Sequence, residues 1–109
     1  MITNLQDHFQ QLEPPYPAPM PDQDVQDAVQ RAIEDLAGQR HMAWLGDGPI
    51  QTHLIASLIC ELQFRLDEAI VLAADQDTDL ADIAQLAGIS TDQTRQTITN
   101  IDPENDLAN

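Results

Sequence analysis

Apolar residues recur at steps of three and four in the first half of the chain, which is the spacing of one face of an α-helix. They predict a helix over residues 22–38 that begins at Asp22 or Asp24 as its capping residue and ends at Gly38. The apolar stripe consists of Val25, Ala28, Val29, Ala32, Ile33 and Leu36. Polar residues occupy the other faces, so this helix is expected to pack one side on a core.

A longer helix is predicted over residues 49–74, because Pro49 fits its first turn and no later Pro or Gly interrupts it. It carries two apolar seams on nearly opposite sides. The broad seam consists of Ile55, Leu58, Ile59, Leu62, Leu66, Ala69, Ile70 and Ala73, and the second of Cys60, Phe64 and Val71. Either the other helices of the chain cover both seams, or a second copy covers one of them in a homodimer through this long helix.

Two short helices are predicted next, over residues 79–86 and 91–100, with Gly88 as the break between them. Ser90 and Gln93 have the spacing of a capping box at the start of the last helix. A long central helix would therefore be followed by two short helices joined by a tight turn, which is the order of a helix-turn-helix.

The predicted domain covers residues 22–101 and is all-α. Residues 1–21 before it are expected to form a flexible, Pro-rich tail, because five prolines within eight residues fix the backbone and remove its donors. Within this tail Ile2, Leu5, Phe9 and Leu12 have helical spacing, so the start of the chain is either a short docking helix or a frayed terminus. Residues 102–109 are expected to be a flexible C-terminus.

Residues 80–98 resemble the helix-turn-helix of LacI-type repressors, and the stretch from 56 to 98 is similar to small actinobacterial helix-turn-helix proteins. A small residue is needed where the two helices cross, a glycine in the turn, apolar residues beneath both, and a cap on the second helix. The matching structural residues are Ile83, Ala84, Gly88, Ile89 and Ser90. The resemblance covers about the last half of the chain and implies a DNA-binding regulator.

The same resemblance implies that the second short helix enters the major groove of DNA. The DNA-contacting candidates are Thr91, Gln93, Thr94, Arg95 and Gln96. Among them Gln93 can pair with adenine and Arg95 with guanine. Asp92 departs from the pattern, because it puts negative charge where phosphate oxygens would approach, and Thr94 and Thr97 stand where such families place aliphatic residues.

The charge of the chain changes this picture. It has 19 Asp+Glu, only four Lys+Arg, all of them arginine, and a formal net charge of −15. Unaided non-specific DNA binding is excluded, because neutralising several phosphates needs more cations on one face than this chain has. Two accounts of the acidity remain open: general adaptation to a salt-rich cytoplasm, and a surface that repels DNA and attracts basic proteins.

Candidate catalytic and metal-binding residues are few. His8, His41, His53 and Cys60 lack the spacing of a zinc site, and the acidic run from Asp75 to Asp79 lacks the later ligands of a calcium loop. Ser57 lies one helical turn after His53, but no acid orients that pair. The sequence therefore predicts no enzyme, no cofactor and no metal.

The localisation expected from the sequence is cytoplasmic. The first residues have no basic region and no long apolar stretch of the kind that a signal peptide needs, and the longest apolar run, residues 54–60, is too short to cross a membrane. A single cysteine, Cys60, cannot form an internal disulfide and favours a reducing compartment.

Two functions follow as expectations. The first is a small regulator of transcription that reads DNA through its helix-turn-helix, as a dimer or within a complex. The alternative is an acidic interaction module, such as a DNA mimic, anti-repressor or adaptor, that binds a basic nucleic-acid-associated protein. A structural component of a phage or plasmid machine is a third class that no residue excludes.

Overall fold

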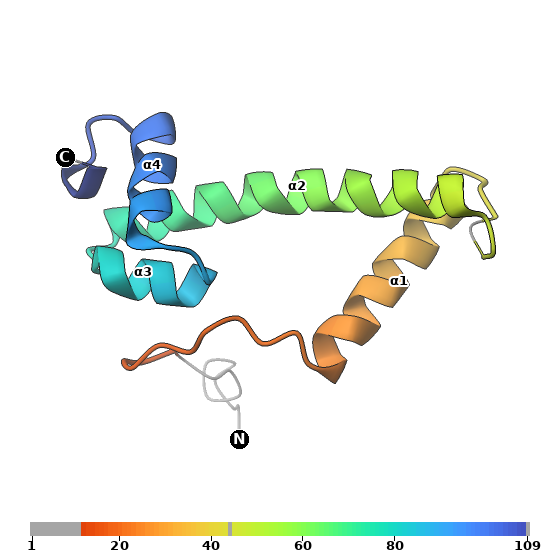
Figure 1. Ribbon diagram of the computed structural model, residues 1–109, viewed down its shortest axis with the longest axis horizontal. Helices are drawn as coiled ribbons and strands as arrows, with labels where there is room; N and C mark the ends of the chain where they lie inside the picture. Colours follow the sequence, from red (N-terminus) through yellow and green to blue (C-terminus); the bar gives the residue numbers. More distant parts are fainter. Residues whose placement is uncertain (1–11, 44, 109) are drawn as a thin grey trace, which may run out of the picture.

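The computed structural model describes residues 12–43 and 45–108, and within these ranges all regular structure is helical (Figure 1). The elements are α1 (Gln23–Gln39), α2 (Gly48–Asp75), α3 (Leu80–Ala87), α4 (Thr91–Ile101) and a 3₁₀ helix, η2 (Asp106–Ala108). The predicted all-α fold with a long central helix is confirmed, and each predicted helix boundary lies within one residue of the observed one. No helix in the described part is long and apolar enough to cross a membrane.

Side-chain caps start three of the four α-helices. The Asp22 carboxylate accepts the Val25 N–H at 3.2 Å, and the Asp47 carboxylate accepts the Ile50 N–H at 2.9 Å. At α4 the predicted capping box is present: the Gln93 N–H donates to Ser90 Oγ at 3.0 Å, while Gln93 Oε1 accepts the Ser90 N–H at 3.1 Å. These bonds satisfy N–H groups that have no partner inside the helix.

Helix α1 does not end at Gly38, where the sequence predicted its end. It continues to Gln39, and His41 takes the left-handed conformation with φ 56°. The Met42 N–H then donates to the Ala37 carbonyl at 2.9 Å, which closes a Schellman turn. Met42 packs against the buried cluster of Ile33, Ala37 and Leu54. This contact holds His41 in a conformation that usually favours glycine.

The core is divided into two clusters at opposite ends of α2, a helix about 42 Å long (Figure 1). The elbow core joins α1 to the start of α2 and consists of the buried residues Ile33, Ala37 and Leu54. The terminal core joins the end of α2 to the following helices and consists of Ile70, Ala74, Ile83 and Ile98. The middle of α2 lies between the two clusters and belongs to neither.

The segments at either end of the domain both run back towards α3 and α4. Residues 12–21 form no helix and extend from α1 to α3, where Pro19 lies so close to Gly88 that a Cβ there would be 2.9 Å from Pro19 Cγ (Figure 1). Residues 102–108, which were expected to be flexible, include η2, and Leu107 packs against the terminal core. The helical spacing noted in residues 1–11 lies outside the described residues.

Candidate recognition surface of the helix-turn-helix end

Helices α3 and α4 are joined by a three-residue turn whose first residue, Gly88, is left-handed with φ 70°. The Ile89 N–H donates to the Ala84 carbonyl at 3.1 Å, so this turn is also a Schellman motif. Ile83 and Ala84 are buried, Ile89 packs against the terminal core, and Ser90 caps α4. The five residues that the sequence analysis singled out as structural therefore lie in the core, in the turn, or at the cap of α4.

Thr94 must be removed from the set of DNA-contacting candidates. Its side chain is 0% exposed, and its hydroxyl donates to the Ser90 carbonyl at 2.8 Å. Thr94 therefore takes the inward position that aliphatic residues usually fill, because the hydroxyl is satisfied within the helix and the methyl group packs inward. The next threonine, Thr97, is half-buried and bonds the Gln93 carbonyl in the same way.

The other four candidates, Thr91, Gln93, Arg95 and Gln96, are exposed on α4. Two of them are engaged within the helix. Gln93 uses Oε1 in the capping box, and Arg95 Nη1 forms an ion pair with the Asp92 carboxylate at 3.1 Å. Both side chains proposed to read a base are therefore held by neighbours on their own helix.

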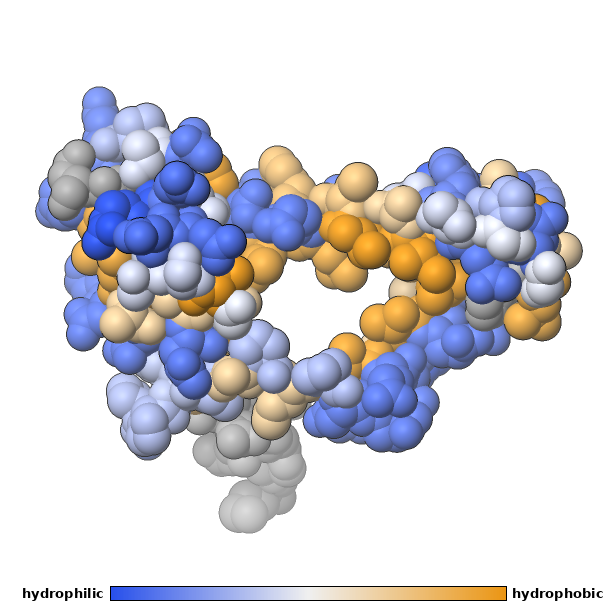
Figure 2. Space-filling view, viewed as in Figure 1, coloured by the Kyte–Doolittle hydropathy of each residue, from blue (hydrophilic) through white to orange (hydrophobic). Residues whose placement is uncertain are grey.

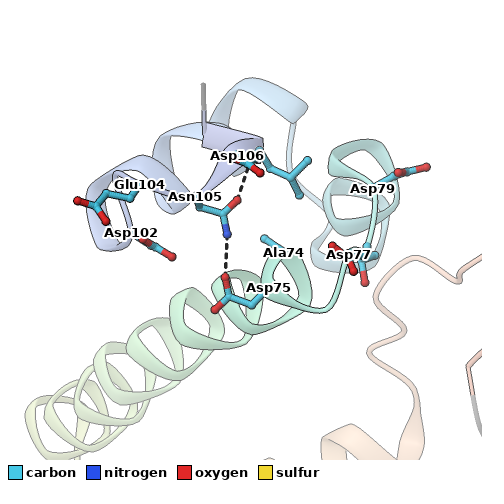
Figure 3. A pocket seen from close by; sticks show the side chains of 10 residues that line it. Ala74, Asp75, Asp77, Asp79, Asp102, Glu104, Asn105 and Asp106 are labelled. Carbon is cyan, nitrogen blue, oxygen red and sulfur yellow. Dashed lines mark hydrogen bonds between the residues drawn. The ribbon is translucent and has the colours of Figure 1, made fainter.

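An acidic depression lies beside helices α3 and α4 (Figure 3). It has a volume of about 600 Å³ and is open to solvent. Its six carboxylates come from the end of α2, the turn into α3, and the segment after α4: Asp75, Asp77, Asp79, Asp102, Glu104 and Asp106. No arginine lines it, so any group that binds there meets concentrated negative charge.

One amide connects two of the walls. Asn105 donates from Nδ2 to the Asp75 carboxylate at 2.8 Å, and its Oδ1 accepts the Leu107 N–H at 2.8 Å (Figure 3). Nothing in the sequence joined Asp102, Glu104 and Asp106 to the run from Asp75 to Asp79, because they lie 23 or more positions further along the chain. One signal in the sequence was available. Leu107 is an apolar residue in a polar segment, and such a residue is suited to pack back on a core.

The charge is strongly uneven along the molecule. Residues 75–108 carry eight carboxylates and one arginine, the paired Arg95. The remaining arginines belong to the other end and to the middle of α2: Arg65 pairs with Glu61, Arg40 Nη1 lies 2.8 Å from His53 Nε2, and Arg31 Nε donates to the Asp27 carbonyl. The end of the molecule formed by residues 75–108 therefore has a formal charge of −7.

The residues weighed for metal binding and catalysis are not brought together. In residues 12–43 and 45–108 no group of three His, Cys, Asp or Glu side chains is arranged to hold a metal ion. Ser57 donates its hydroxyl to the backbone carbonyl of His53, and Cys60 is exposed. His8 lies outside the described residues.

Comparison with known proteins adds no relative. No family model matches the chain, and no curated protein or solved structure matches it significantly.

Proposed function

We propose that this protein is a regulatory interaction module in which the helix-turn-helix serves as a scaffold, and that it binds a cationic segment of a nucleic-acid-associated protein at the acidic depression. The observation that carries this proposal is the gathering of six carboxylates from three separate segments around one open depression without a lining cation. Lysine and arginine side chains are the protein groups that such a surface attracts.

The surrounding charge supports a protein partner over DNA. An end with a formal charge of −7 repels the phosphate backbone, and Arg95 is its only cation and is already paired. Lysine and arginine side chains that neutralise phosphates supply a large share of the affinity of DNA complexes. A basic peptide gains from the same charges that a duplex would have to overcome.

The depression also has a defined shape. Leu107 and the Asn105–Asp75 hydrogen bond hold the C-terminal wall against the end of α2. A wall that is fixed before binding loses less conformational freedom on association than a free acidic tail. Binding of a basic peptide at this depression can therefore be distinguished from a general attraction to the negative chain by removing charges inside and outside the depression.

The test is a titration of the full chain with a labelled Lys/Arg-rich peptide, followed by fluorescence anisotropy. The site variant Asp77→Asn/Glu104→Gln/Asp106→Asn removes three charges from the depression, and Asn keeps the left-handed φ of 64° at position 77. The control variant Asp24→Asn/Asp27→Asn/Asp35→Asn removes the same charge from α1. We expect the site variant to weaken binding about tenfold and the control variant no more than about twofold.

Salt provides a second readout. Raising ionic strength from about 20 to about 200 mM should weaken the peptide complex, because screening shortens the range of the attraction. Equal losses in the site and control variants would show that net charge alone drives binding. Absence of binding to the unmodified chain at low salt would overturn the proposal.

DNA recognition is the second candidate, and the exposed row of Thr91, Arg95 and Gln96 on a firmly capped helix favours it. Selection from a random duplex pool at low salt should then enrich a sequence, and Arg95→Ala should abolish the enrichment. Arg65→Ala is the matched control, because Arg65 also belongs to an exposed ion pair but lies on α2. A pool that stays random, with the peptide still bound, would leave the interaction module as the function.

A further inference from the structure

The sides of α2 and α1 that face each other expose a set of apolar side chains. It is formed by Ile55, Ile59, Leu62 and Leu66 of α2, with Val25 and Val29 of α1, and is called here the apolar face. These six side chains are 37% to 59% exposed. Figure 2 shows hydrophobic residues along the inner sides of α2 and α1, where the two helices diverge. Two shallow apolar grooves run along α2, one towards α1 and one towards α3.

The spacing along α2 is that of a helix that packs on another helix, and in the middle of α2 this row is exposed. Ile55, Ile59, Leu62, Leu66, Ala69 and Ala73 follow one another at steps of four, three, four, three and four. This alternation is the a/d repeat of a coiled coil, in which each side chain inserts between side chains of a facing helix. The chain's own α1 covers only the start of α2, and α3 and α4 cover only its end.

The apolar face is also the side of α2 with the least negative charge. Between residues 55 and 73 the only carboxylates are Glu61, Asp67 and Glu68, and none of them is at an a or d position. Glu61 lies at the edge of one groove, where Arg65 pairs with it at 3.1 Å. Two chains of net charge −15 repel each other, so they can associate only through a surface of this kind.

The exposed area matches the requirement of a homodimer. The six side chains leave on the order of 500 Å² of apolar surface in water. A standard interface buries about 800 Å² on each partner, and about 65% of a homodimer interface is apolar, which again gives about 500 Å². A basic partner would find little to pair with on this face, whereas a second α2 supplies the same repeat.

We propose that the apolar face is occupied by α2 of a second copy of this chain, so that the protein is a homodimer in which the two long helices pack side by side. The proposal does not depend on the function proposed for the acidic depression. The dimer carries two helix-turn-helix ends on one rigid body, and each end keeps its own depression.

Sedimentation equilibrium of the full chain tests this directly, with an expected mass of twice 12.1 kDa. Ile59→Gln/Leu62→Gln should raise the dissociation constant of the dimer at least about 100-fold. Phe64→Gln is the matched control: Phe64 and Leu62 are both 58% exposed, but Phe64 lies about 200° round the helix from Leu62. We expect Phe64→Gln to leave the dimer unchanged.

A cross-linking experiment keeps the proposal testable if the double variant does not fold. A photoreactive amino acid at position 59 should join two chains, and the same group at position 64 should not. A monomer at all concentrations, a dimer that survives Ile59→Gln/Leu62→Gln, or equal cross-linking at both positions would overturn the proposal. A monomer in which the group at position 59 cross-links to residues 1–11 of its own chain would overturn the dimer and identify that segment as the occupant.

Salt separates this proposal from the one for the acidic depression. Screening reduces repulsion between two negative chains, so the dimer should become tighter as salt rises. Binding of a basic peptide should become weaker over the same range. A dimer that dissociates as salt rises would contradict packing through the apolar face.

Discussion

The two ends of α2 hold cores of different kinds. Four segments enclose the terminal core: α2, α3, α4 and η2, which brings Leu107. Within residues 12–43 and 45–108, the elbow core is formed by α1 and α2, with Met42 from the loop between them. The terminal core is closed within one chain, whereas the elbow core opens directly into the apolar face. The homodimer proposed above would extend the elbow core across the apolar face, whereas the terminal core needs no second copy.

The largest expected loss of stability comes from a substitution in the terminal core. Ile98 is 0% exposed and lies among side chains from several helices, so Ile98→Ala should lower the free energy of unfolding by about 3 to 5 kcal/mol. Leu54 is equally buried but has fewer segments around it, and Leu54→Ala should cost about 2 to 3 kcal/mol because the elbow can relax. Urea denaturation followed by circular dichroism measures both, and a larger loss for Leu54→Ala would contradict the comparison.

Two glycine substitutions should change the free energy of unfolding by smaller amounts, and in opposite directions. Gly88→Ala should destabilise the protein by about 1 to 2 kcal/mol, because alanine resists a φ of 70° and its Cβ would meet Pro19. Gly38→Ala should stabilise it by about 0.5 to 1 kcal/mol, because Gly38 lies within α1 and has open space around it. Thermal unfolding of the two variants should therefore shift in opposite directions, and two shifts of the same sign would refute this account.

The most local effect concerns the cap of α4. Ser90→Ala removes the acceptor of the Gln93 N–H and should cost about 1 kcal/mol. Ser90→Asn is the control, because asparagine caps a helix as well as serine does and should retain most of the stability. Hydrogen exchange of the first amides of α4 measures the cap locally, and unchanged protection in Ser90→Ala would count against its role.

Local signals in the sequence were enough to place the helices. Asp22 and the Ser90–Gln93 pair act on amides within three residues of themselves, so their effect does not depend on the rest of the fold. The ends of α1 and α2 were harder to assign, because their left-handed residues are His41 and Asp77 instead of glycine. In the turn after α1, packing of the next residue on the core selects this conformation, and no local rule contains that contact.

The candidate site was predicted only in part, for the same reason. The turn at Gly88 and the capping box at Ser90 followed from local residues, but the sequence did not show that Thr94 is buried or that Arg95 pairs with Asp92. The acidic depression could not be predicted, because Asp75 and Glu104 are distant in the chain and meet only when Leu107 folds back on the terminal core.

The sequence by itself determined the all-α class, the four helices and the excess of negative charge, because helix periodicity, caps and charge are properties of neighbouring residues. Only the tertiary structure decided that the core is divided into two, that six carboxylates surround one depression, and that the rest of the described chain leaves the middle of α2 uncovered. These features depend on which distant segments pack together. That packing is decided by the burial of a few apolar residues that lie far apart in the chain.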